Sequence, residues 1–202
     1  MALTRIPGLM PPNFSAVYAF VFCAGALLPG PRAWILPFGL LVATDLALNG
    51  YYQWVRGWEV FTLTGLAFQT ANYAGYAALF GLGRGFRPAR RWLALVAGGL
   101  LGATVFYLVT NTAAWLFNPF RNPEYTRSLA GWLVALTKGT GGYPQTWEFF
   151  RNTLLSGGLF TALFAGAWRV TACESPADKG ESEAPESEAP SDDAPIPGGA
   201  ET

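Results

Sequence analysis

Polar side chains inside long apolar stretches are the residues of this sequence best placed to do chemistry. Asp45 lies late in an apolar run and Asn49 follows four residues later, so on a helix both share one face. An ionisable group at membrane depth costs a few kcal/mol on insertion scales and usually faces a bundle interior or a water-filled cavity. The pair therefore predicts a ligand or ion site. The alternative is that Asp45 lies near the interface, pairs with Arg56 or Arg32, and anchors the end of its helix.

Two further apolar runs carry amides and aromatic rings at helical spacing. Asn111 and Trp115 lie one turn apart and could hold a planar polar ligand by hydrogen bonding and stacking. An earlier run presents a polar and aromatic stripe made of Gln69, Asn72, Tyr73 and Tyr76. Stripes of this kind often line a cavity, and they serve equally well as structural contacts between helices.

The last apolar run opens with charged and amide side chains. Glu148 and Arg151 are three residues apart and can pair with each other, which is the alternative to a role in binding. Asn152 follows directly. The predicted ligand-binding set is Asp45, Asn49, Asn72, Asn111, Trp115, Arg151 and Asn152.

The sequence contains no histidine and only two cysteines, Cys23 and Cys173. The usual zinc, haem and Ser-His-Asp chemistries need histidine. We therefore expect no metal site, no cofactor, no catalytic residue and no enzyme activity. An intramembrane enzyme restricted to carboxylate or amide chemistry is the weaker alternative.

The composition favours a membrane protein over a soluble domain. Of 202 residues, 51% are apolar and 13% are charged. Nine of the 13 acidic residues lie from Glu174 onward, while 12 of the 13 basic residues precede it, so the zero net charge hides a basic body. The basic residues are scattered between apolar runs, and for that reason we expect no nucleic-acid partner.

The lengths of the apolar runs predict the architecture. A bilayer core about 30 Å thick needs roughly 20 residues at 1.5 Å each. We expect an all-α polytopic transmembrane bundle of about six helices at residues 13–28, 32–49, 60–82, 92–117, 128–137 and 147–168. The fifth is too short to cross alone and is expected to be tilted, re-entrant or interfacial.

The chain divides into a bundle at residues 1–172 and an acidic tail at 173–202. The tail is rich in Glu, Ser, Ala, Pro and Asp and repeats Glu-Ser-Glu-Ala-Pro over residues 181–190. Such a segment cannot bury enough apolar surface to fold, so we expect it to be disordered.

Four arginines at positions 84, 87, 90 and 91 form the densest basic loop. The positive-inside rule places this loop in the cytoplasm. Six full spans would then put both termini outside, whereas a fifth helix that fails to cross would put the tail inside.

Four short motifs carry a resemblance to a known family. They are PPNFSAV at 11–17, ATDL at 43–46, VFYLVTN at 105–111 and WEFFRNTLL at 147–155. Together they resemble an uncharacterised family of small bacterial membrane proteins, which is similar to the substrate-binding S components of energy-coupling-factor vitamin transporters. The resemblance covers the chain to about residue 169.

The resemblance implies a six-helix protein that binds a vitamin or metal ion near the outer face. It also implies docking on a transmembrane coupling subunit through small residues of the first helix, here relaxed to Ser15, Ala19 and Cys23. S components keep both termini in the cytoplasm, and with six full spans that placement conflicts with the positive-inside rule.

Two functions follow as hypotheses for a multi-pass protein of the bacterial inner membrane. The first is an S-component-like subunit that binds a small solute for uptake. The second is a non-catalytic accessory or scaffold subunit of a larger membrane complex, with the acidic tail recruiting a basic partner. The expected partners are the lipid bilayer, other transmembrane subunits and a small solute. A closed polar pocket containing Asp45 and Asn111 would favour the first hypothesis, and side chains satisfied within the bundle would favour the second.

Overall fold

The computed structural model describes residues 1–87, 91–119 and 121–174, with side chains described as far as residue 171. Within that part the chain forms only helices and loops, as the sequence predicts. The helices are α1 (Val17–Leu27), α2 (Arg32–Gly50), α3 (Leu63–Gly85), α4 (Trp92–Phe117), α5 (Leu129–Thr137) and α6 (Thr146–Glu174), with a short 3-10 helix η1 (Ala2–Arg5) and a π-helical turn η2 (Tyr51–Val55). The predicted disordered tail lies, from residue 175, outside the described residues.

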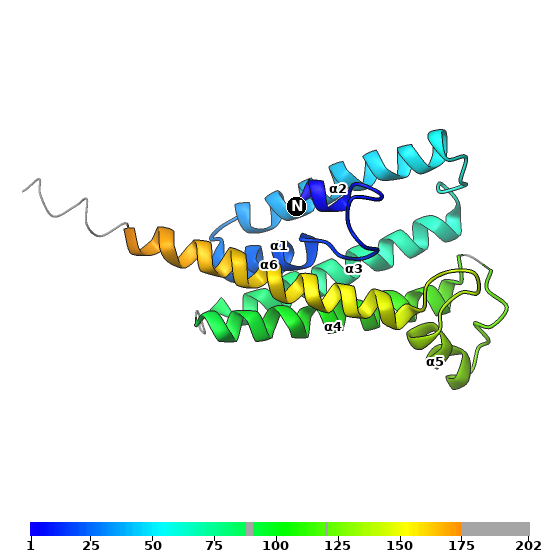
Figure 1. Cartoon of the computed structure of the whole chain (residues 1–202). Coiled ribbons are helices and arrows are strands. Elements are labelled where there is room, and N and C mark those ends of the chain that lie inside the picture. The colour runs from blue at the N-terminus through cyan, green and yellow to red at the C-terminus, as the bar shows by residue number, and fades with distance from the viewer. Residues whose placement is uncertain (88–90, 120, 175–202) are drawn as a thin grey trace, which may run out of the picture.

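Three helices are long and apolar enough to cross a membrane: α2 continued through η2, then α4 and α6. They run beside α3 along the long axis of the molecule (Figure 1). Their outer faces expose large apolar side chains such as Leu46, Leu108 and Leu163. Water would penalise such faces, whereas hydrocarbon does not, so the arrangement is that of a membrane protein.

The first helix is shorter than predicted. The expected run at 13–28 becomes helical only at Val17, because Asn13 adopts a left-handed backbone conformation, with φ 61°. In the opposite direction, the expected connector at 50–59 continues α2 as far as Val55. The predicted 92–117 helix coincides with α4.

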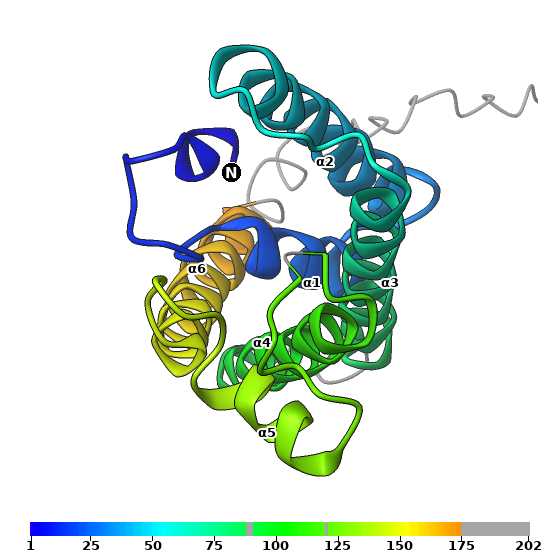
Figure 2. The same cartoon turned by 90° about the vertical axis from the view of Figure 1, so that its right-hand side faces the viewer.

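The short α1 lies at the centre of the bundle. All of its residues except Phe20 are buried, and it contacts α2, α3, α4 and α6, which surround it in Figure 2. Eleven residues span about 16 Å, roughly half of a bilayer core. The helix α1 therefore fills only about half of the length of the bundle interior. Loops and side chains of the surrounding helices occupy the rest.

Small residues set the close helix contacts. A Cβ at Gly83 would lie 2.2 Å from the Phe22 carbonyl oxygen of α1, and one at Gly98 would lie 2.6 Å from the Phe22 ring. On the other side of α4, the Trp92 indole N–H donates to the Ala162 carbonyl of α6 over 3.0 Å. These contacts hold α3 and α6 against the central helix and α4.

The fifth helix does not cross the bundle. It packs at the end where α4 finishes and α6 begins: the Tyr107 hydroxyl donates to the Leu136 carbonyl, and the Trp132 indole donates to Thr112 Oγ1 over 2.9 Å. Consequently the end of α3, the start of α4 and the end of α6 lie at one end of the molecule (Figure 1). The end of α3, which carries Arg84, and the C-terminal end of α6 therefore share one end of the molecule, so the positive-inside rule would place both on the same side of a membrane.

Candidate solute-binding site

A large cavity lies at the end of the bundle that α1 does not reach. Its volume is about 660 Å³, within the range typical of small-molecule sites. It is lined by residues from α2, η2, the 58–62 loop, α3 and two loops opposite: Asn49, Tyr52, Trp58, Glu59, Val60, Phe61, Thr62, Gly65, Leu66, Phe68, Gln69, Pro119 and Tyr143.

A second cavity of about 320 Å³ adjoins the first. It is lined by Asn13, just before α1, by Asn111 of α4, and by residues at the start of α6. Phe68 and Tyr143 line both cavities. Two aromatic side chains thus belong to the walls of both a larger and a smaller chamber.

The outer wall of the larger cavity is held by local contacts. The Gln53 side-chain oxygen accepts hydrogen bonds from the backbone N–H groups of Val60 and Phe61, at 2.9 and 3.4 Å. The rings of Tyr52 and Trp58 stack with centroids 4.9 Å apart and planes 9° from parallel. The 58–62 loop is therefore folded back on η2, and its side chains are positioned before any ligand arrives.

Two of the predicted site residues line these chambers. Asn49 lies in the wall of the larger cavity, at the end of α2. Asn111 lies in the wall of the smaller one, and its amide N–H donates to the Tyr107 carbonyl one turn earlier, over 2.9 Å. That bond fixes the amide and leaves its carbonyl oxygen as the group able to accept from a ligand.

Asp45 lies beside the larger cavity without lining it. It is buried, forms an ion pair with Arg5, and accepts a hydrogen bond from the Gln69 side-chain amide over 2.9 Å. The alternative that Asp45 anchors its helix named Arg56 or Arg32 as the ion-pair partner, and this is wrong. The partner of Asp45 is Arg5. Arg5 comes from η1, a separate segment 40 residues away along the chain.

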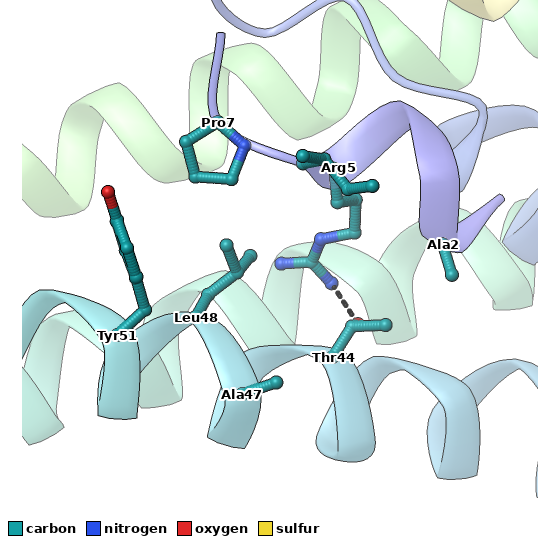
Figure 3. A pocket seen from close by; sticks show the side chains of 8 residues that line it. Ala2, Arg5, Pro7, Thr44, Ala47, Leu48 and Tyr51 are labelled. Carbon is teal, nitrogen blue, oxygen red and sulfur yellow. Dashed lines mark hydrogen bonds between the residues drawn. The ribbon is translucent and has the colours of Figure 1, made fainter. Parts of the chain in front are cut away.

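The N-terminal segment lies beside α2, on the side towards α6 (Figure 2). Figure 3 shows the Arg5 side chain pointing from η1 towards Thr44, whose hydroxyl accepts a hydrogen bond of 2.8 Å. Between η1 and α2 lies an open, mainly apolar pocket of about 450 Å³ bordered by Pro7, Leu48 and Tyr51. Gln69 lines the larger cavity and donates to Asp45. The contacts of Asp45 with Arg5 and Gln69 therefore fix the position of one side chain of the cavity wall.

The two predicted residues on α6 lie elsewhere. The Arg151 guanidinium lies over the Trp147 ring, 5.5 Å from its centroid, and the Asn152 amide donates to the Pro12 carbonyl over 3.0 Å. The expected Glu148–Arg151 ion pair is not formed: Glu148 instead accepts from the backbone N–H of Gln145. Neither Arg151 nor Asn152 lines either cavity.

Trp115 and Asn72 also lie outside the two chambers. The Trp115 indole donates to the Thr126 carbonyl over 2.7 Å, and this bond ties α4 to the loop before α5. Asn72 is half-buried on α3, and its side chain makes no hydrogen bond within the described chain. Of the seven predicted site residues, Asn49 and Asn111 line a cavity and Asp45 lies beside one. The other four lie elsewhere: Asn72, Trp115, Arg151 and Asn152.

The residues that sequence reasoning missed are mostly aromatic. Tyr52, Trp58, Phe61 and Glu59 fall in or beside the segment interpreted as a connector between two spans, and Tyr143 falls in a glycine-rich loop. The signal that could have found them is the density of aromatic residues in that connector, which exceeds what an interfacial anchor requires.

Comparison with known proteins identifies a family. The model of a family of unknown function, DUF6580, matches residues 1–178. No curated protein and no solved structure matches the chain.

Proposed function

The chain belongs to the family of unknown function DUF6580, and from that premise we propose that it is the solute-binding subunit of an uptake system in the bacterial inner membrane. The observation that carries the proposal is the 660 Å³ cavity at one end of an apolar bundle, with aromatic walls and a few polar groups. Chambers of this size and character are the usual binding sites for small molecules between helices.

The shape of the molecule supports an S-component-like subunit. The cavity lies at the end away from the arginine-rich loop, so the positive-inside rule puts the cavity on the outer side and the C-terminal end of α6 in the cytoplasm. A solute arriving from outside would meet the cavity first. The bundle crosses the bilayer several times on this proposal, with α5 lying at the outer end.

Coupling to a transport partner would use a different surface from the one that the resemblance implies. Ser15, Ala19 and Cys23 are all buried within the bundle. A face buried in this way is not available for docking. The outer face of α2, with Trp34 and Ile35 exposed, is a better place for a second transmembrane subunit.

The same exposed face favours the second candidate function, an accessory or scaffold subunit without a solute. The Asp45 network is satisfied within the chain, as that hypothesis requires. The exposed apolar side chains of α2 would then be a contact surface for a larger membrane complex. This function predicts stoichiometric partner subunits and no retained small molecule.

The experiment that separates the two functions is identification of what co-purifies with the chain in mild detergent. We expect wild-type protein to release a small molecule on denaturation, detected by mass spectrometry. Leu66→Trp should lose this molecule, because the larger ring would occupy the cavity that Leu66 lines. Leu63→Trp is the matched control, since Leu63 lies one turn away on α3, is 88% exposed and does not line the cavity.

Two results would contradict solute binding. One is equal retention of the molecule by both variants, and the other is protein partners in fixed stoichiometry without any small molecule.

A further inference from the structure

We infer that the solute bound in the larger cavity is a planar organic cation, a flat aromatic or heteroaromatic ring system that carries a permanent positive charge. This inference rests on the proposed solute-binding function and names its substrate class. It is carried by the charge and the ring content of the cavity wall.

The first observation is the charge of the wall. Of the described residues that line the cavity, Glu59 alone carries a formal charge at neutral pH, and none is basic. Glu59 makes no ion pair with any residue in the described part of the chain. An unpaired carboxylate at the mouth of an apolar chamber attracts cations and repels anions. One carboxylate is too few ligands for a metal ion, which would need several oxygen donors.

One basic group behind the cavity wall is already neutralised. Arg5 approaches the cavity from behind through Asp45, and the two charges are paired with each other. Gln69 bonds to this pair, lines the cavity and presents a neutral amide. The pair therefore adds no net positive charge to the wall, and Arg56, three residues before Glu59, neither lines the cavity nor pairs with Glu59 within the described chain.

The second observation is the number of rings around the carboxylate. Among the residues that the structure describes, five aromatic side chains line the cavity: Tyr52, Trp58, Phe61, Phe68 and Tyr143. The faces of aromatic rings are electron-rich and attract cations, tryptophan most strongly, and they also stack on flat ligands. Together these properties select a flat cation over a flexible or anionic solute.

The third observation is that the charge and the rings are held in place. Trp58 stacks on Tyr52, and the backbone N–H of Trp58 donates to the Tyr52 carbonyl over 2.9 Å. Glu59 follows directly, and the next residue, Val60, is held by Gln53. Since the loop is ordered before binding, little conformational entropy is lost when a ligand stacks on it.

The experiment uses three flat probes of one size and different charge: 1-methylquinolinium, 2-methylquinoline and quinoline-2-carboxylate. Binding to the full chain in nanodiscs of neutral lipid is measured by quenching of tryptophan fluorescence, after release of any co-purified solute. We expect the cation to bind at least about tenfold more tightly than the neutral ring, and the anion to bind most weakly.

Variants assign the preference to Glu59. Glu59→Gln should reduce the affinity for the cation about tenfold and leave that for the neutral ring unchanged, and Glu59→Lys should reverse the order of cation and anion. Glu124→Gln is the matched control, because Glu124 is an exposed carboxylate in the loop between α4 and α5 and lines neither cavity. It should behave as wild type.

Equal binding of the three probes, blocked by Leu66→Trp, would overturn the charge class and leave solute binding standing. Failure of all three to bind would overturn the cation inference, and solute binding itself would then be decided by the co-purification result. A cation preference that survives Glu59→Gln would also contradict the inference.

Discussion

At the residue scale, the ion pair of Arg5 with Asp45 takes two charges largely out of water. Both side chains are largely buried, at 15% and 9% exposed, and Thr44 and Gln69 complete their hydrogen bonds. Removing one partner of a buried ion pair leaves an uncompensated charge, whereas replacing both with apolar residues of similar size is often neutral. The pair is therefore expected to fix the position of η1 on α2.

We predict that Asp45→Ala lowers the free energy of unfolding by about 3 to 5 kcal/mol. Arg5→Met combined with Asp45→Leu should recover most of that loss, because neither charge remains. The measurement is denaturant unfolding of the wild type, the single variant and the double variant in the same mixed micelles. If Asp45→Ala unfolds like wild type, Asp45 is not an anchor, and the ligand interpretation of its sequence position gains weight.

At the element scale, the contact of α3 with α1 depends on the absence of side chains at the crossing. A Cβ at Gly25 would lie 2.4 Å from the Phe80 carbonyl oxygen, and Gly83 faces α1 in the same way. A side chain at either position would push the helices apart by contact with backbone atoms, which cannot rotate away. The central helix would then lose packing along its length.

Gly83→Ala should accordingly destabilise the bundle by about 1 to 3 kcal/mol. Gly81→Ala is its matched control on the same helix, since a Cβ there meets no atom within 4 Å and alanine favours the helix. Thermal unfolding of both variants in the same detergent provides the comparison. Equal unfolding temperatures would show that the helix crossing is looser than described.

The helices were largely predictable from the sequence, because hydrocarbon leaves an apolar run few conformations that satisfy its backbone. Long apolar runs such as 92–117 have one stable conformation in hydrocarbon, so their bounds follow from composition. The start of α1 was not predictable in this way. Residues 13–16 follow a Pro-Pro pair that is typical of a helix start, yet Asn13 turns the chain, and Pro12 is held by Asn152, 140 residues further along the chain.

The site was less predictable than the fold, because only part of its wall lies in the apolar runs. Polar residues within apolar runs are visible in the sequence, and Asn49 and Asn111 were identified by this signal. The aromatic residues of the cavity wall lie in loops, where the same composition is expected of a membrane interface. Only the folding of the 58–62 loop onto η2 distinguishes the two roles.

At the scale of the whole molecule, the proposed function requires that hydrocarbon surrounds the bundle and that the cavity opens to water at the outer end. Both concern which side chains meet water. Tyr143 lines the cavities and is 64% exposed, whereas Leu108 lies in the middle of α4 and is 42% exposed. By exposed fraction alone, a water-soluble reagent would reach both side chains. In a membrane, we expect only Tyr143 to face water, because Leu108 faces hydrocarbon.

The most direct test is therefore labelling of single cysteines by a membrane-impermeant maleimide in intact cells, in a background with Cys23→Ala and Cys173→Ala. The account predicts rapid labelling of Tyr143→Cys from outside and no labelling of Leu108→Cys until the membrane is dissolved. Labelling of both at similar rates would contradict the hydrocarbon environment. Protection of Tyr143→Cys until the cells are permeabilised would contradict a cavity that opens outward.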